Sequence, residues 1–349
     1  MKAAVLTKYR KIEIQDVPTP TYSDSEVLIK VKYAGICGSD QHIFNGDFHP
    51  RTKLPMIPGH EFSGTITEIG KNVKNYKKGD RVTVDPIIWC GYCPACKLKH
   101  YPACTTLKLI GVDMNGGFAE YVSADESMLY KIDDKISDKE ASLIEVLSIG
   151  FHACNRAGLK ESDTVVIWGA GRIGHCILQA VRTITKKTIF IVDIIDSRLN
   201  LAKKHFNNII TINSKKENAI EIIKDKTNNR GVDIAFESVG HSTHIPNSPN
   251  PIQGCILSIH GAGVVCVLGL ADDPVPIIFK ELIWREAKII ASRVTHGEFS
   301  KTIQQMSKKN LKPDILISKE FALNDTQEAF EKLEKEPEKY LKILLNISK

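Results

Sequence analysis

Four of the nine cysteines in this 349-residue chain fall inside one short stretch. They are Cys90, Cys93, Cys96 and Cys104, in the spacing C-x2-C-x2-C-x7-C. Four thiolates so close together satisfy the tetrahedral preference of Zn²⁺ and leave no coordination position open. Buried, unreactive thiols are the alternative, which the gathering of four of the nine cysteines within 15 residues disfavours. The spacing therefore predicts a structural zinc site in a lobe at about residues 88–106.

A second set of possible metal ligands is dispersed along the chain. Cys37 lies in the stretch GICGSDQH, His60 and Glu61 lie in PGHE, and Glu145 comes much later. A thiolate, an imidazole and carboxylates suit zinc, and fewer than four fixed ligands would leave a position for water or substrate. Taken singly, these residues also have plain structural interpretations: a buried small thiol, a hydrogen-bonded histidine and a solvated helix residue.

A glycine-rich turn lies between an apolar run at 164–168 and a helix-period face of isoleucine and valine. Its residues are Gly169, Ala170, Gly171, Arg172, Ile173 and Gly174. Glycines here permit a tight turn and the close approach of a pyrophosphate, which then meets the free N–H groups and positive dipole end of the helix. The turn therefore predicts a dinucleotide site; a glycine turn that binds nothing is the alternative.

Asp193 stands 19 residues after Gly174, beside the end of a second expected strand at 188–192. A carboxylate there can accept hydrogen bonds from the hydroxyls of the adenosine ribose. This arrangement favours NAD over NADP, because the carboxylate would repel a 2′-phosphate. Arg198, close by in the sequence, argues the other way.

The elements that must hold these residues divide the chain in two. At this length a single core usually splits, so two domains are expected. The first 150 residues indicate a mostly β half, with short strands at 26–33, 64–70 and 81–84.

From residue 164 onward, strand-like runs alternate with amphipathic segments, which predicts a parallel sheet with helical crossovers. The six runs are at 164–168, 188–192, 209–212, 232–236, 264–268 and 288–291, as many strands as a doubly wound dinucleotide fold has. A helix at 299–309, a strand at 315–321, a second helix at 325–335 and an apolar end at 341–347 follow.

The charge pattern excludes some classes of partner. The 47 Lys and Arg exceed the 41 Asp and Glu by only six, and they are scattered, which indicates a solvated surface rather than a nucleic-acid footprint. There is no run of about 18 uncharged apolar residues, and the first residues are too soon charged for a signal peptide. We therefore expect a cytoplasmic protein that binds neither nucleic acid nor membrane.

Taken together, these motifs resemble the zinc-dependent medium-chain dehydrogenase/reductase (alcohol dehydrogenase) family. The likeness covers essentially the whole chain, and the motifs come in the family's order and spacing. They are Gly35–Asp40, Gly59–Glu61, the four-cysteine lobe, Gly116–Tyr121 and Gly169–Gly174. The resemblance implies an α/β protein with a GroES-like β-barrel catalytic domain at 1–153 and 292–349, and a Rossmann NAD-binding domain, a doubly wound parallel sheet, at 154–291.

The resemblance also assigns roles to the dispersed residues. Cys37, His60 and Glu61 match catalytic zinc ligands, and Glu145 matches an acid that either binds the zinc or hydrogen-bonds its water. Ser39 and His42 match a proton relay that leads away from the site. The plainer alternatives are a turn-capping serine and a surface histidine.

Within the family, the chain is most similar to the branch of polyol (sorbitol, L-iditol), threonine and sugar-acid dehydrogenases. The implied activity is hydride transfer from a secondary alcohol of a polyol, sugar or sugar acid to NAD, with two zinc ions per chain. Arg293, just past the last expected strand of the sheet, could bind a substrate carboxylate or hydroxyls, and an interdomain ion pair is an equal alternative. A homo-oligomer, dimeric or tetrameric, is implied by likeness alone.

Three other functional hypotheses, and the role of one segment, remain open at this point. A threonine or 2,3-butanediol dehydrogenase would share every motif, whereas a zinc-free quinone reductase of the same fold would not need Cys37 and His60. A zinc-ribbon-like nucleic-acid-binding module would explain the four cysteines but not the glycine turn. The segment His241–Pro251 either shapes an entrance for cofactor or substrate or is a surface insertion.

Overall fold

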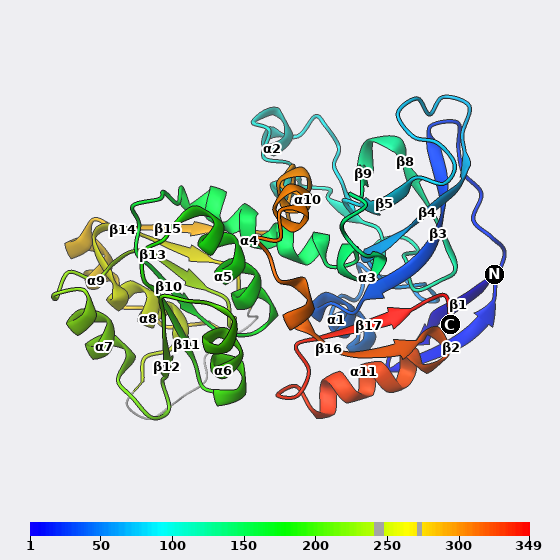
Figure 1. The fold of residues 1–349 in the computed structure, drawn as a ribbon. Helices are drawn as coiled ribbons and strands as arrows, with labels where there is room; N and C mark the ends of the chain where they lie inside the picture. The colour runs from blue at the N-terminus through cyan, green and yellow to red at the C-terminus, as the bar shows by residue number, and fades with distance from the viewer. Residues whose placement is uncertain (241–247, 271–273) are drawn as a thin grey trace. The chain divides into compact units, whose positions relative to one another are not determined.

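The computed structural model describes residues 1–240, 248–270 and 274–349 (Figure 1). The chain divides into two compact units. The first comprises Met1–Val146 and Thr295–Lys349, and the second comprises Leu147–Val294. Within the described ranges, no helix combines the length and the apolar character needed to cross a membrane.

The first unit is built around a seven-stranded sheet that joins the two ends of the chain. Its order is β16-β17-β3-β4-β5-β9, with β8 also paired to β3. The strands are β3 (Glu26–Gly35), β4 (Glu61–Ile69), β5 (Arg81–Val84), β8 (Tyr121–Asp125), β9 (Leu129–Lys131), β16 (Ile317–Ala322) and β17 (Lys342–Asn346). Because β17 pairs antiparallel with β3, the last residues of the chain lie beside the end of β3.

Shorter elements complete this unit. The hairpin of β1 (Lys2–Lys8) and β2 (Lys11–Asp16) was missing from the expected elements. Helix α1 (Gly38–Asn45) follows β3 directly. The remaining elements are α2 (Pro94–Lys97), α3 (Asp138–Ala141), α10 (Phe299–Ser307), α11 (Thr326–Lys335), the 3-10 turns η1 (Tyr101–Ala103), η2 (Glu126–Met128), η3 (Pro313–Leu316) and η4 (Leu323–Asp325), and the ladder of β6 (Ile87–Ile88) with β7 (Lys108–Leu109).

The second unit contains the expected six-stranded parallel sheet, which confirms the doubly wound fold. Its order is β12-β11-β10-β13-β14-β15, and every pairing in it is parallel. The strands are β10 (Val165–Trp168), β11 (Ile189–Asp193), β12 (Ile209–Asn213), β13 (Val232–Glu237), β14 (Ile259–Val267) and β15 (Lys288–Ala291). The strand order reverses between β10 and β13, and ligands of such sheets bind beside the carboxyl ends of the strands at that point.

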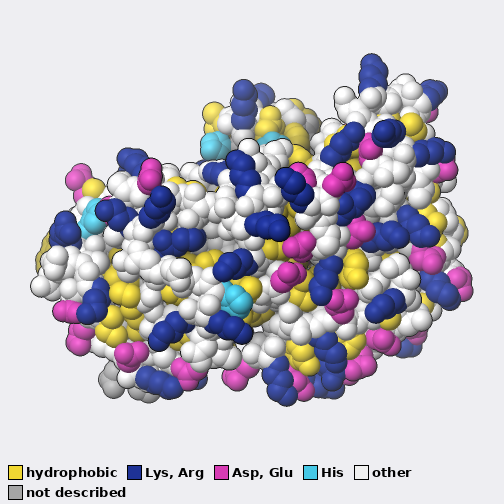
Figure 2. Space-filling view, viewed as in Figure 1, with side chains coloured by type: hydrophobic (Ala, Val, Ile, Leu, Met, Phe, Trp, Pro, Cys, Tyr) yellow, Lys and Arg dark blue, Asp and Glu magenta, His cyan; other side chains and the backbone are white. Residues whose placement is uncertain are grey.

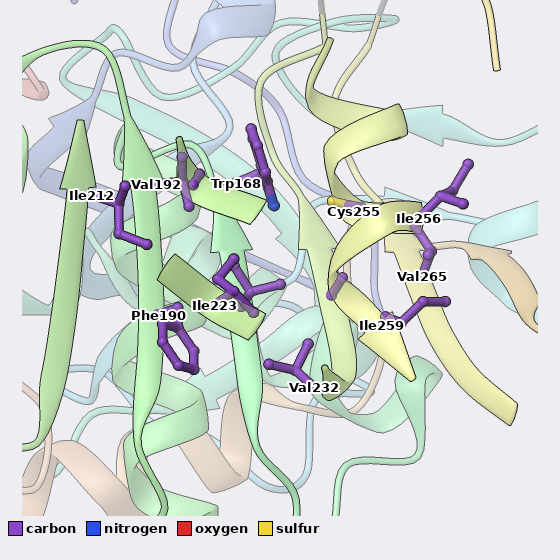
Figure 3. Close-up of a cluster of buried hydrophobic side chains, with 13 residues drawn as sticks. Trp168, Phe190, Val192, Ile212, Ile223, Val232, Cys255, Ile256, Ile259 and Val265 are labelled. Carbon is purple, nitrogen blue, oxygen red and sulfur yellow. The ribbon is translucent and has the colours of Figure 1, made fainter. Parts of the chain in front are cut away.

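Helices cover both faces of this sheet (Figure 1). They are α4 (Ile144–Ala157), whose first residues belong to the other unit, α5 (Arg172–Ile184), α6 (Asp196–His205), α7 (Ala219–Lys226), α8 (Pro251–Ser258) and α9 (Phe279–Arg285). Between sheet and helices lies an apolar cluster that includes Trp168, Phe190, Ile223 and Ile256 (Figure 3). A sheet buried on both faces explains why its strands are continuous apolar runs in the sequence.

One strand begins earlier than its sequence indicated. β14 starts at Ile259 instead of residue 264, and its pairing with β13 is irregular between Val232 and Ile234. Gly261 and Gly263 interrupt the apolar pattern there, and Ala262 has a left-handed φ of 62°. Such a bulge hides the start of a strand from a periodicity argument.

Candidate active site

The four clustered cysteines do come together. One Sγ from each of Cys90, Cys93, Cys96 and Cys104 lies within 4.8 Å of the others. Cys90 N–H donates to Cys104 Sγ, and Cys93 N–H donates to Cys90 Sγ, both at 3.4 Å. All nine cysteines of the chain are free thiols. The lobe therefore has the tetrahedral donor set of a closed zinc site.

Backbone N–H groups favour the thiolate form of Cys93 and Cys104, whereas burial raises the pKa of Cys96 to about 12. N–H groups of Thr105 and Cys96 donate to Cys93 and lower the pKa of its thiol to about 6. The loop returns to the sheet through the ladder β6–β7, so both of its ends are held. A thiolate is the form that binds a metal.

The dispersed ligands are also brought together. Donor atoms of Cys37, His60 and Glu61 lie within 4.8 Å of one another, and both His60, just before β4, and Glu61, its first residue, are buried. The pairing of β3 with β4 places Gly35 opposite Glu61, so that Cys37, which follows β3, reaches the start of β4. Glu145, in the first turn of α4, is buried but lies outside this three-residue cluster.

Three groups at this site, Cys37, His60 and Glu145, have shifted pKa values. Burial alone would lower the pKa of His60, but the charges of Asp40 and Cys37 raise it well above its usual value. Burial and Glu61 oppose ionisation of Cys37, yet His60 and Lys342 lower its pKa. Burial, together with the charge of Glu61, raises the pKa of Glu145 well above its usual value.

A buried lysine lies against the cluster, and sequence reasoning missed it. Lys342 Nζ on β17 contacts Glu61 Oε1 at 2.7 Å and Oε2 at 2.5 Å, and donates to the Ile36 carbonyl at 3.2 Å. Neither charged side chain is exposed at all. The sequence offered one hint, a lysine that opens the apolar run Ile343–Leu345.

The expected relay residues are present but not directly joined. Ser39 Oγ lies 3.3 Å from His60 Nε2, and His42 Nδ1 lies 2.7 Å from Asp47 Oδ2. No hydrogen bond between Ser39 and His42 occurs in the described part of the chain. The relay therefore stays a prediction, and Asp47 is a partner that the sequence analysis did not include.

The glycine turn has the geometry that its sequence indicated. Gly169 has a φ of 103°, and a Cβ at Gly174 would lie 1.9 Å from the Gly169 carbonyl oxygen, so neither position accommodates a side chain. Gly171 is the N-cap of α5 and provides no capping side chain, which leaves the helix N-terminus to an anion. A Cβ at Gly171 would meet only the Arg198 guanidinium, 3.9 Å away.

Asp193 ends β11 directly beside this turn. Its Oδ2 accepts from Ala170 N–H at 2.6 Å, and its Oδ1 accepts from the N–H groups of Ile194 and Ile195 at 2.7 and 2.9 Å. The carboxylate is thus held in place by backbone donors next to Gly171. This is the position from which an acid reaches the ribose in a dinucleotide fold.

Arg293 is exposed on the short segment after β15. The next residue, Val294, has a left-handed φ of 47°, a costly conformation for a β-branched residue. The predicted entrance at His241–Pro251 falls mostly on residues 241–247, outside the described residues; its last residues lead into α8, where Asn250 caps the helix through Gln253 N–H.

Comparison with known proteins identifies the family. Residues 23–134 match the alcohol dehydrogenase GroES-like domain, and residues 173–308 match the zinc-binding dehydrogenase domain. The chain is 33% identical to the sorbitol dehydrogenase of Bacillus subtilis (strain 168) over 349 residues, 99% of this chain and 97% of the relative. The chain belongs to the zinc-type medium-chain alcohol dehydrogenase family.

Other members share its length and fold. L-idonate 5-dehydrogenase of Vitis vinifera is 31% identical, with 94% of this chain and 90% of the relative covered. The NADH complex of the alcohol dehydrogenase RspB of Escherichia coli CFT073 superposes with a TM-score of 0.89 at 30% identity, over 99% of both chains. A zinc-binding dehydrogenase of Sinorhizobium meliloti 1021 bound to NADP gives 0.90 at 26% identity, again over 99% of both.

Family membership makes the chain an oxidoreductase of the alcohol and polyol dehydrogenase type. It also confirms the expected GroES-like and Rossmann architecture. Family membership therefore favours a dehydrogenase that uses zinc and a nicotinamide coenzyme over the hypothesis of a zinc-ribbon binding module. A zinc-free reductase of this fold would leave the cluster of Cys37, His60 and Glu61 without a purpose.

Proposed function

We propose that this enzyme oxidises a secondary alcohol of a polyol, sugar or sugar acid with NAD⁺, at the cluster of Cys37, His60, Glu61 and Glu145. The observation that carries the proposal is the convergence of the first three donor atoms within 4.8 Å in a buried setting. We further propose that 1–153 with 292–349 is the catalytic domain, and that 154–291 holds the coenzyme.

The donor chemistry of the cluster fits a zinc ion. One oxygen of Glu145, Oε2, is buried without a hydrogen-bond partner, which is costly unless a cation faces it. The negative charges of Cys37, Glu61 and Glu145 would balance those of Zn²⁺ and Lys342. We assign Cys37, His60 and Glu61 as ligands, with Glu61 sharing its carboxylate with Lys342, and Glu145 as an acid that either binds the zinc or hydrogen-bonds its water.

The four lobe cysteines fit a second zinc ion, and the two ligand sets share no residue. We therefore propose two zinc ions per chain, one in the lobe and one at the catalytic cluster. Elemental analysis of purified enzyme is expected to give two zinc per chain. A protein that contains none, and that keeps its activity after chelation, would contradict the proposal.

Zinc and NAD⁺, when bound, supply a Lewis acid for the substrate hydroxyl and an acceptor for the hydride. The chain's own residues must then carry off the hydroxyl proton. Ser39 lies beside His60, and so beside the place where that hydroxyl would bind. We propose that Ser39 takes the proton in exchange for its own, and that His42 delivers it to solvent.

We propose that Asp193 makes the enzyme prefer NAD⁺. Backbone donors fix its carboxylate beside Gly171, where it can bind ribose hydroxyls and repel a 2′-phosphate. Replacement of Asp193 by Ala is expected to lower kcat/KM for NAD⁺ by about tenfold, the loss of one charge-assisted hydrogen bond, and to narrow the gap to NADP⁺. Wild-type enzyme that works better with NADP⁺ would overturn this assignment.

Substrate class is tested by a screen with NAD⁺ across polyols, aldonic acids, sugar phosphates and threonine. If Arg293 binds a substrate carboxylate, aldonic acids are expected to have a lower KM than neutral polyols of equal length, because a guanidinium binds a carboxylate in bidentate fashion. Activity confined to threonine or 2,3-butanediol would replace the polyol proposal with the second candidate. That candidate is supported by the same cluster geometry.

We also propose that the enzyme is a homodimer joined through β15 and α9. β15 is an edge strand, and in α9, which precedes it in the chain, Phe279, Ile283 and Trp284 are 68%, 74% and 73% exposed. Two such edges related by a twofold axis can pair antiparallel and bury these side chains. Sedimentation is expected to give a dimer that Trp284→Glu weakens, whereas Tyr92→Glu, at an equally exposed lobe position, does not.

Charges of both signs are mixed on the visible face of the molecule. On the face shown in Figure 2, Lys and Arg side chains are interspersed with acidic ones. Together with Leu270, the apolar side chains of α9 and the lobe are the most exposed large hydrophobic groups in the described part of the chain. This contrast supports an apolar contact between subunits.

A further inference from the structure

Helix α1 ends in a turn that folds the chain back over its own last residues. Gly46, at the C-cap, has a left-handed φ of 96°, which suits glycine. The N–H groups of Gly46 and Asp47 both donate to the His42 carbonyl, at 3.0 and 2.9 Å. The turn therefore brings the side chains of residues 47 and 48 to the imidazole of His42.

Both side chains contact the imidazole. Asp47 Oδ2 lies 2.7 Å from His42 Nδ1, and the ring of Phe48 is stacked on the imidazole with centroids 5.9 Å apart and planes 9° apart. His42 nevertheless keeps 46% of its side chain exposed. The imidazole is thus held at one nitrogen and on one face while it remains open to water.

The contact with Asp47 decides which nitrogen carries the hydrogen. A carboxylate only accepts hydrogen bonds, so Nδ1 must donate. In neutral imidazole the other nitrogen, Nε2, then has the lone pair. The stacked Phe48 restricts rotation of the ring, so the direction of that lone pair is fixed as well.

We propose that Asp47 and Phe48 are positioning residues for His42, which fix its Nδ1–H tautomer and ring plane so that Nε2 receives the proton released from the substrate hydroxyl. The inference rests on the proposed relay. The O–H bond of the alcohol breaks, its proton passes through the Ser39 hydroxyl, and an N–H bond forms at Nε2. Nδ1–H stays bonded to Asp47, whose charge stabilises the transient imidazolium, and the Nε2 proton then leaves to water.

The first test reads the tautomer directly. Full-length, zinc-loaded enzyme is labelled with ¹⁵N-histidine, and the His42 resonances are assigned by their loss in His42→Gln. We expect Nδ1–H in the wild type and in Asp47→Glu. In Asp47→Asn the amide can donate as well as accept, so the Nε2–H form is expected to gain population. An unchanged tautomer in Asp47→Asn would overturn the proposal.

The second test measures proton release with a pH indicator in a single turnover. Asp47→Asn is expected to slow release by about tenfold and Phe48→Leu by less, whereas Asp47→Glu and the surface variant Asp134→Asn stay near the wild type. In a His42→Ala background, Asp47→Asn is expected to have no further effect, because its action passes through the imidazole. A further tenfold loss there would show a merely structural role and overturn the inference.

The outcomes separate this inference from the function beneath it. If His42→Ala leaves proton release at the wild-type rate, the relay itself is wrong and the positioning role falls with it. If His42→Ala slows release but Asp47→Asn behaves like Asp134→Asn, the relay stands and only the present inference is overturned.

Discussion

The two proposed zinc sites of this chain are assembled in opposite ways. The lobe takes its four ligands from residues 90–104, held by one short ladder and hydrogen bonds from its own backbone. The proposed catalytic cluster draws Cys37 from just after β3, His60 and Glu61 from the start of β4, Glu145 from a helix and Lys342 from the end of the chain. The lobe needs only its own loop, whereas the cluster exists only in the folded unit.

The difference in assembly goes with a difference in chemistry. Four thiolates close the lobe to further ligands, so a metal there can only stabilise. The cluster combines a thiolate, an imidazole and two carboxylates with one buried lysine, and its groups shift each other's pKa values. Strong mutual perturbation is typical of a site at which charge must change during a reaction.

The largest expected effect is a loss of turnover, and it should occur at the cluster and not at the lobe. Cys37→Ser removes a ligand of the open cluster, so turnover is expected to fall by at least about a hundredfold. Fold and NAD⁺ binding should persist, since neither depends on that thiol. Steady-state kinetics, circular dichroism and the thermal shift with NAD⁺ check this. Normal turnover in the variant would show that the cluster is not the catalytic site.

Cys93→Ser should act in the opposite way. Loss of a lobe ligand removes binding free energy that is also folding free energy, so the thermal midpoint is expected to fall by more than about 5 °C. Activity per folded enzyme should be retained at low temperature. A variant that is as stable as the wild type but inactive would reverse the two assignments. Calorimetry with zinc analysis measures both effects.

Lys342→Met tests whether the cluster depends on its distant lysine. It leaves the Glu61 carboxylate buried without its cation, and breaking a buried pair in this way costs about 3–5 kcal/mol. The zinc-free enzyme should be destabilised most, because zinc can replace part of the lost charge. In the double variant Glu61→Gln/Lys342→Met the stability should largely return. Denaturant titration with and without zinc distinguishes these states, and a double variant no more stable than the single one would refute the charge argument.

The smallest effect concerns Asp85, at the base of the lobe. Burial, and next the charge of Glu298, raise the pKa of Asp85 to about 7, and His296 Nδ1 lies 4.0 Å away. The folded state holds this proton to higher pH than the unfolded state. Protonation of Asp85 therefore contributes fully to the free energy of unfolding at low pH, and this contribution is lost as pH rises towards 7. The Asp85→Asn variant cannot ionise at this position. Its free energy of unfolding should therefore rise relative to that of the wild type between pH 4.5 and pH 8, by on the order of 2 kcal/mol.

Thermal midpoints of both proteins at the two pH values measure that difference. If the thermal midpoints of variant and wild type differ by the same amount at pH 4.5 and pH 8, Asp85 is ionised in the folded protein throughout this range. The same variant leaves all four lobe cysteines in place. It therefore separates the stability of the base of the lobe from that of the metal site itself.

Local patterns determined much of this protein. The cysteine spacing predicted the lobe, the glycine turn predicted the start of α5, and the continuous apolar runs predicted the six strands of the parallel sheet. Each of these features depends on residues close together in sequence. Ligand geometry, backbone conformation and burial on both faces of a sheet all leave a periodic or spaced signature there.

Only the tertiary structure decided which distant groups share one environment. Lys342 and Glu61 are separated by almost the whole chain, and they meet because β17 pairs with β3 and β3 with β4. Strand register of this kind depends on packing between segments whose sequences do not indicate that they pair. A buried lysine and an exposed one have the same local pattern, so the partner that neutralises the catalytic cluster emerged only from the fold.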